Sequence, residues 1–302
     1  MDERRPVWDE IGANRFKSFL LMVGFGVLVG LAGWTFGELT GAGPAGSLVS
    51  LAFAGVAAFS TYWYCDRIVL AASGAKPVDP LKHRALVNLV EGLAIAAGLP
   101  VPRIFTIDDT APNAFATGRD PKHAAIAVTT GLLDKLDRLE LEGVLAHEMS
   151  HIANFDIRMT TLAGVMVGSV ALLSDWMMRS LRWGMWSGGG RSRRSDGALP
   201  IALVAIVFAI LAPIAAQLLR MAVSRQREYL ADANGALLTR FPEGLARALE
   251  KLAADREPLE VANRATSPLF IVNPLHDHKP GRAGLFDTHP PIEERIRRLR
   301  AM

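Results

Sequence analysis

The amino-acid sequence predicts a mostly helical (α+β) membrane protein, with about four transmembrane helices and a water-exposed domain that carries a small β-sheet. Two observations lead to this fold class. Half of the 302 residues are apolar and only 21% are charged, and the apolar residues gather in four long runs instead of spreading through the chain. Short β-type segments lie in a more polar stretch between the second and third runs.

Three of the apolar runs are predicted to cross a membrane. The first, residues 18–37, has no ionisable group and would rise about 30 Å as a helix. The second, residues 46–65, ends in Tyr62-Trp63-Tyr64, amphipathic aromatic side chains that are typical of the headgroup boundary. The fourth, residues 198–219, is equally free of charge.

The third apolar run is ambiguous. Residues 160–174 are uncharged but few, and Asp175 interrupts the run. Such a length fits a transmembrane helix, a partly submerged helix or a buried helix of the soluble domain.

The segment between the third and fourth runs is rich in arginine, although a four-span topology places it outside. Either these two runs form a hairpin that does not fully cross, or the flanking segments override the local charge bias.

The basic residues indicate membrane orientation and not nucleic-acid binding. The net charge is only +3, and lysines and arginines flank the first two runs, whereas the linker 38–47 has none. The positive-inside rule therefore places both flanks in the cytoplasm. A single cysteine, Cys65, excludes an intramolecular disulfide, which fits a domain facing the cytoplasm. We expect a multi-pass protein of the cell (inner) membrane, in contact with the lipid bilayer and without a nucleic-acid partner.

The chain divides into four predicted parts. Residues 1–65 form an N-terminal transmembrane hairpin, 66–159 the first part of a catalytic domain, 160–219 a second apolar helix pair, and 220–302 the second part of the catalytic domain. In the first part, a helix starts at Asp79-Pro80, and two β-type segments follow at 103–107 and 124–129. In the last part, we expect a helix through 224–232, an amphipathic helix with leucines at 245, 249 and 252, and a short helix after Pro290-Pro291.

The most informative stretch is His147-Glu148-Met149-Ser150-His151, on a helix predicted from about residue 136 to 154. Residues four apart lie above one another on a helix, so His147 and His151 can direct ring nitrogens at one ion. Glu148 is turned away from that face, but it can reach a water molecule on the metal and act as a general base. These five residues alone leave open that the histidines are unrelated, so the context must decide.

That context resembles the membrane-embedded zinc metallopeptidases of the HtpX type, which are related to the CAAX prenyl protease. The resemblance rests on the HExxH motif at 147–151, the Glu-x-x-x-Asp pattern at 228–232, Thr288-His289-Pro290-Pro291 followed by Glu294-Arg295-Ile296, the segment 113–118 and the order of the four apolar runs. It covers most of the chain and implies a zincin-like metalloprotease domain.

The resemblance implies one Zn²⁺ per chain, held by His147, His151 and Glu228, with Glu148 as general base. It also implies that Asp232 orients a ligand imidazole, although a surface charge paired with an arginine remains an alternative. His289 resembles a histidine that lies near the active site in this family and could donate a hydrogen bond to the developing oxyanion. The alternative is that His289 is only a residue at the start of a helix. Arg225 braces Glu228 or Asp232, or is an ordinary juxtamembrane arginine.

Two further segments carry weaker expectations. The segment Asn113, Ala114, Phe115 and Ala116 resembles a strand that lines the cleft and could hold substrate backbone by strand addition; the alternative is a turn with a core phenylalanine. His276 and His278 lie in a loop without helical spacing, and we expect them to be exposed loop residues.

The favoured function is a membrane-integrated, zinc-dependent endopeptidase that cleaves membrane proteins or their cytoplasmic segments. The resemblance implies a role in protein quality control and stress response. Two alternatives remain: a dedicated prenyl-peptide processing protease, and a non-catalytic membrane scaffold or channel-like helical bundle. The sequence does not indicate the oligomeric state.

Overall fold

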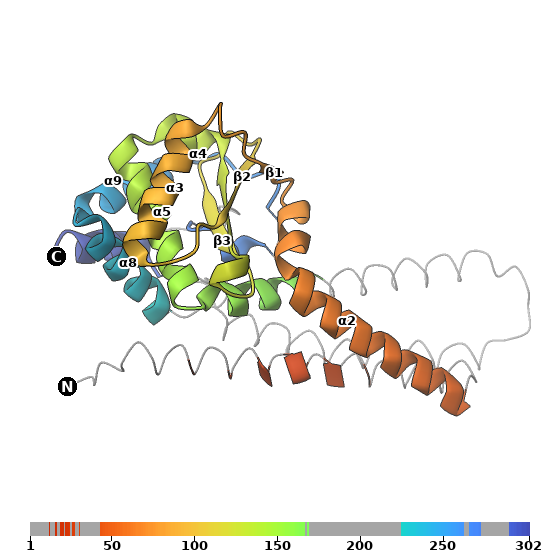
Figure 1. The fold of residues 1–302 in the computed structure, drawn as a ribbon. Coiled ribbons are helices and arrows are strands. Elements are labelled where there is room, and N and C mark those ends of the chain that lie inside the picture. The colour runs from red at the N-terminus through yellow and green to blue at the C-terminus, as the bar shows by residue number, and fades with distance from the viewer. Residues whose placement is uncertain are drawn as a thin grey trace, which may run out of the picture.

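The computed structural model describes residues 43–166, 225–262, 266–272 and 290–302, with a few isolated positions between 12 and 30 and residue 168. Within these ranges the chain forms a helical domain around a small sheet, and helix α2 projects from it (Figure 1). The elements are α2 (Gly43–Ala72), β1 (Lys76–Pro77), α3 (Arg84–Ala97), β2 (Arg103–Ile107), β3 (Ala114–Thr117), η1 (Pro121–His123), β4 (Ala125–Thr129), α4 (Thr130–Lys135), α5 (Arg138–Ala153), α8 (Arg225–Thr239), α9 (Pro242–Ala254), η2 (Ser267–Leu269) and α10 (Ile292–Leu299).

The sheet has four strands in the order β1-β2-β4-β3. Strands β2 and β4 are parallel, and β1 and β3 run antiparallel to their neighbours. The β-type segments predicted at 103–107 and 124–129 correspond to β2 and β4. Strand β3 lies at one edge of the sheet and is buried throughout, because helix α5 packs beside it.

The helix ends follow from local sequence. Helix α3 ends at Gly98, whose φ of 65° is left-handed and therefore suits glycine. Helix α5 begins after Asp137, which forms a capping box with Glu140: each side chain accepts a hydrogen bond from the other residue's backbone N–H. The motif helix thus starts two residues later and ends one residue earlier than predicted.

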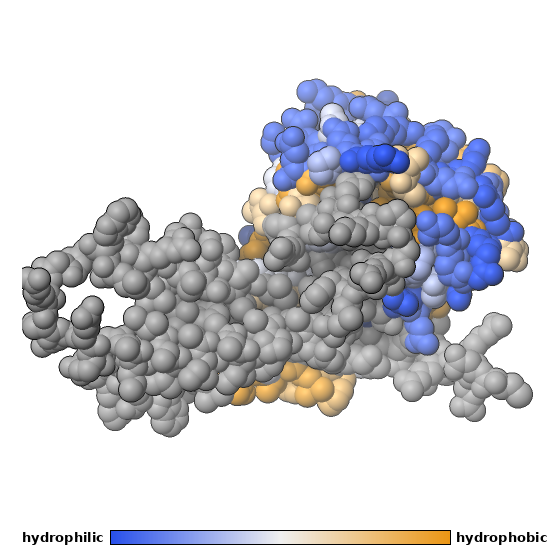
Figure 2. All heavy atoms as spheres, turned by 180° about the vertical axis from the view of Figure 1, so that it is seen from behind, coloured by the Kyte–Doolittle hydropathy of each residue, from blue (hydrophilic) through white to orange (hydrophobic). Residues whose placement is uncertain are grey.

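Helix α5 is the centre of the domain. It packs against α3, α8, α9 and β3, and only a few of its residues reach the surface. The main apolar core contains side chains from both sides of the 160–219 segment, including Val144 and Leu145 from α5 and Leu245 and Leu249 from α9. Seen from behind, the described surface of this domain is mostly hydrophilic (Figure 2).

Among the helices that the structure describes, none combines the length and apolar character that crossing a membrane requires. The fourth predicted transmembrane run lies wholly outside the described residues, the first is described only at isolated positions, and the third only at residues 160–166 and 168. The number of membrane-spanning helices therefore stays a prediction. The predicted mixture of many helices with a small sheet is confirmed.

Candidate metal centre

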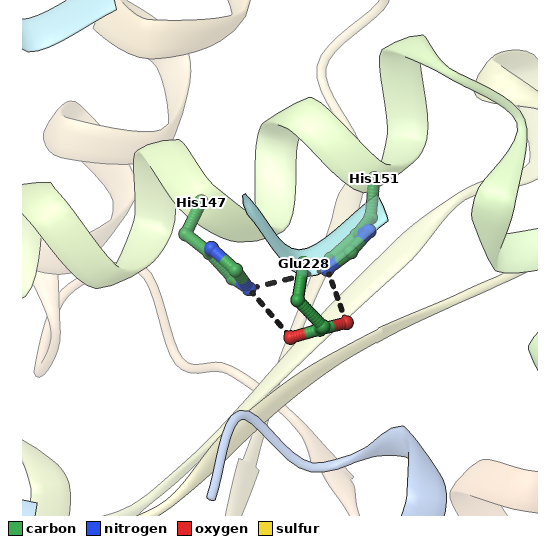
Figure 3. Close-up of side chains that lie close together, drawn as sticks. All are labelled: His147, His151 and Glu228. Carbon is green, nitrogen blue, oxygen red and sulfur yellow. Dashed lines mark hydrogen bonds and ion pairs between the residues drawn. The ribbon is translucent and has the colours of Figure 1, made fainter. Parts of the chain in front are cut away.

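Three side chains from two helices meet at one point (Figure 3). His147 and His151 lie one turn apart on α5, with their Nε2 atoms 3.1 Å from each other. Glu228, in the first turn of α8, places its carboxylate oxygens 3.7 Å from Nε2 of His147 and 3.5 Å from Nε2 of His151. Ligand atoms about 2.1 Å from a zinc ion in tetrahedral geometry lie about 3.4 Å apart. The separations therefore fit this donor set around one zinc-sized cation.

Close packing of the two helices brings Glu228 to the histidines. Gly235 of α8 lies against the backbone of α5, where an added Cβ would be 3.1 Å from the amide nitrogen of His147. That contact would be tighter than an ordinary van der Waals contact. Because glycine has only a hydrogen atom in place of the Cβ, the two helices can approach each other here. The position of the Glu228 carboxylate thus depends on a residue two turns further along α8.

A buried carboxylate and a buried arginine orient His147. Oδ1 of Asp232 lies 2.9 Å from Nδ1 of His147, and Arg295 donates from Nη2 to Oδ1 at 2.7 Å and from Nε to Oδ2 at 2.9 Å. When Nδ1–H of His147 is donated to Asp232, the Nε2 lone pair points into the site. Burial alone would raise the pKa of Asp232, but Arg295 and the hydrogen bond with His147 hold it at about 2.

The second histidine also has a carboxylate partner. Oδ2 of Asp156 lies 3.2 Å from Nδ1 of His151. Burial lowers the pKa of His151, but Asp156 and Glu228 outweigh it and raise that pKa to about 9. A cation bound at Nε2 would compete with the proton and keep the imidazole neutral.

Glu148 lies in the same cavity as the three candidate ligands. The cavity is lined by Ala116, His147, Glu148, His151, Ile157, Thr160, Glu228, Leu269, Phe270 and Ile271. Burial raises the pKa of Glu148 to about 7, against the attraction of the His151 ring. A carboxyl group with this pKa can both accept and release a proton near neutrality, as a general base and acid must.

The predicted substrate-binding segment forms β3 and the residue before it. Asn113 is buried, and its Nδ2 donates to the carbonyl of Val272 at 3.0 Å. The backbone N–H of Ile271 donates to the carbonyl of Ala114 at 3.0 Å. Part of the outer edge of β3 is therefore covered by the chain's own segment 270–272, and Ala116 is the β3 residue that lines the cavity.

Other predicted site residues lie elsewhere. Arg225 is exposed at the start of α8, and Arg295 is the arginine that contacts Asp232 and approaches Glu228, with Nη1 3.7 Å from Oε2. His276, His278 and His289 lie outside the described residues.

Sequence reasoning assigned no role to Arg295 or Asp156. A signal for Arg295 was present, since it shares a helix face with Ile292, Ile296 and Leu299. A charged residue on an apolar face requires a buried partner.

Known proteins resemble this chain along most of its length. The model of a family described as "Peptidase family M48" matches residues 80–302. A "Protease HtpX homolog" of Dictyoglomus thermophilum is 48% identical over 295 residues, which cover 98% of this chain and 94% of that protein. A protein of the same name from Thermoanaerobacter pseudethanolicus is 43% identical over 300 residues, which cover 99% of each.

A solved structure shares the fold. The crystal structure of S. mikatae Ste24p superimposes with a TM-score of 0.50 at 21% sequence identity, covering 97% of this chain and 66% of that one. At this identity the likeness concerns the fold alone.

Proposed function

Because this chain belongs to peptidase family M48 and is an HtpX-like metalloprotease, we propose that it is a zinc-dependent endopeptidase integrated in a membrane. One Zn²⁺ per chain would be held by His147, His151 and Glu228. The observation that carries the proposal is the convergence of three side chains in one cavity: the two Nε2 atoms lie 3.1 Å apart, and the two carboxylate oxygens of Glu228 lie 3.5 and 3.7 Å from them. Two imidazole nitrogens and one carboxylate are a common donor set for catalytic zinc, which keeps a fourth position for water or substrate.

The mechanism follows from the positions of the side chains. Zinc, when bound, supplies Lewis acidity to the scissile carbonyl and lowers the pKa of the attacking water. Glu148 takes the proton of that water and later passes it to the leaving amine, which its pKa of about 7 permits. Asp232 keeps His147 in the tautomer that directs Nε2 at the cation. His289 is proposed, from the family resemblance, to donate to the developing oxyanion.

Substrates are proposed to be polypeptides bound in an extended form. Ala116 lies on the edge strand β3 and lines the cavity beside Glu148. An extended peptide could therefore pair with β3 near Ala116 and place its scissile bond over the three ligands. Within this proposal, the segment Asn113 to Ala116 positions substrate, with Asn113 fixing the cavity wall through Val272.

Membrane proteins, or their cytoplasmic segments, are the proposed substrates, and protein quality control is the proposed role. Helix α2 supports a membrane location because it extends away from the catalytic domain (Figure 1), and its large apolar side chains Leu48, Val49, Val56 and Phe59 are exposed. Contact with lipid would bury them. The distribution of basic residues supports an inner-membrane protein with the catalytic domain in the cytoplasm.

Zinc analysis paired with a proteolysis assay tests the proposal. The purified wild type should contain about one zinc per chain and cleave casein or itself. Glu148→Gln should keep its zinc and lose activity by about 10²- to 10⁴-fold, since only the general base is removed. A metal-free wild type would contradict the zinc site, and full activity in Glu148→Gln would contradict the mechanism. Selective cleavage of a prenylated peptide over casein would favour the dedicated processing protease instead.

A further inference from the structure

We infer that Asp156 is a positioning residue for the proposed metal site, and that Arg227 holds it in place. Asp156 would fix the ring of His151 so that its Nε2 lone pair faces the cation. The inference rests on the zinc site proposed above. It concerns a residue outside the HExxH and ExxxD motifs.

Both oxygens of Asp156 are engaged by side chains. Oδ2 lies 3.2 Å from Nδ1 of His151, and Oδ1 lies 3.5 Å from Nη1 of Arg227. The Asp156 side chain is only 3% exposed and that of Arg227 is 10% exposed. A carboxylate so far from water requires a compensating cation and hydrogen-bond donors. Arg227 supplies the charge, and His151 supplies the donor.

The arrangement repeats the one at His147. There, Asp232 meets Nδ1 of the imidazole and Arg295 pairs with Asp232. Each histidine therefore has its own carboxylate at Nδ1, and each carboxylate has its own arginine. These partners come from different parts of the chain, since Asp156 follows the end of α5 and Asp232 lies in α8.

Fixing both tautomers has a direct consequence for metal binding. The two Nε2 atoms are 3.1 Å apart, so a proton on either one could bridge them and remove both lone pairs from coordination. When each ring is neutral and its Nδ1–H donates to a carboxylate, both Nε2 atoms present lone pairs to each other. That arrangement is repulsive unless a cation lies between them. The two carboxylates thus hold both Nε2 lone pairs in the direction of a bound cation.

The simpler explanation is that Asp156 only begins the next helix. It is the first residue of the helical segment 156–166, directly after Phe155, whose φ is 60°. A negative charge in a first helical turn is favourable on its own. This role predicts a loss of stability on substitution but no specific effect on the metal, so metal affinity and metal geometry distinguish the two roles.

The test measures metal binding by the full-length protein purified in detergent. Asp156→Asn keeps the shape of the side chain and removes its charge. It should bind zinc about 10- to 100-fold more weakly in competition with a chelator, and its Co²⁺-substituted form should show a shifted visible absorption spectrum. The matched control is Asp255→Asn, which breaks an ion pair with Lys135 of 2.6 Å outside the site and should leave both readouts unchanged.

A second variant covers the case in which Asp156→Asn does not fold. Arg227→Gln removes the partner of Asp156 and should weaken zinc binding in the same direction by a smaller factor. Wild-type affinity and an unshifted Co²⁺ spectrum in either variant would overturn the inference. A wild type that binds no zinc would instead refute the proposed function, so the two failures are distinguishable.

Discussion

The charges of individual residues explain why a divalent cation suits this site. The Asp232 carboxylate is neutralised by Arg295, and the Asp156 carboxylate faces Arg227. These pairs leave Glu228 and Glu148 as the acidic groups that line the cavity itself. A buried negative charge is costly without compensation, and a bound dication changes the local charge balance in favour of both glutamates. Because Arg295 and Arg227 compensate Asp232 and Asp156, the charge of a bound cation is available to compensate Glu228 and Glu148.

The third ligand can be tested by substitution. Glu228→Ala should strongly lower zinc occupancy, because it removes one of the three proposed protein ligands. Asp232→Ala should weaken zinc binding less, by about 10- to 100-fold, because it acts only through the orientation of His147. Zinc content after dialysis against buffered free zinc measures both effects.

A matched control for this comparison is Glu243→Ala, which removes an exposed glutamate that pairs with Arg300. It should retain wild-type occupancy. Unchanged zinc in Glu228→Ala would assign the third ligand to another residue.

The sequence predicted those site residues whose geometry is local. His147 and His151 are four positions apart on one helix, so their convergence follows from helix periodicity. Glu228 came only from the family resemblance, because no local rule relates α5 to α8. Asp156 was missed since its role depends on a turn after α5, and Arg295 since its partner Asp232 is distant in sequence.

At the scale of elements, the approach of α8 to α5 decides whether the site forms. Gly235→Ala would place a Cβ 3.1 Å from the His147 amide nitrogen and 3.3 Å from its Cα. Both neighbours are backbone atoms and cannot rotate away, so α8 must shift and carry Glu228 with it. We expect weaker zinc binding and a free energy of unfolding lower by about 1–3 kcal/mol. Chelator competition and thermal unfolding measure the two effects.

Gly92→Ala is the control for this prediction. Gly92 lies in α3 and an added Cβ would meet nothing within 4 Å. Alanine should therefore stabilise that helix by about 0.5–1 kcal/mol without changing zinc affinity. Equal zinc affinity in Gly235→Ala and the wild type would show that the helix approach does not limit the site.

The elements themselves were largely predictable, but their pairing was not. Helix α9 follows from leucines on one face, and β2 and β4 from short β-type runs. The contact of Ile271 with the edge of β3 joins residues far apart in the sequence. No local pattern indicates such a contact, and it was therefore absent from the expectations for β3.

At the scale of the whole molecule, the catalytic domain is assembled from two chain segments that the 160–219 stretch separates. Residues of α5 and α9 share one apolar core, and the candidate metal ligands come from α5 and α8. The predicted helix pair 160–219 would therefore have to begin and end on the same side of this domain. A membrane hairpin satisfies this condition, since antiparallel helices begin and end on the same side.

The proposed membrane contact of α2 can be tested with cysteine labelling. In a Cys65→Ser background, Val56→Cys lies on α2 and Leu81→Cys lies on the catalytic domain; the native side chains are 63% and 89% exposed. Maleimides react with the thiolate, which forms in water and not in lipid. A membrane-impermeant maleimide applied to inverted inner-membrane vesicles should therefore label Leu81→Cys quickly and Val56→Cys only after SDS is added. Because both positions are apolar and open in the structure, equal labelling in intact vesicles would mean that water and not lipid surrounds this part of α2.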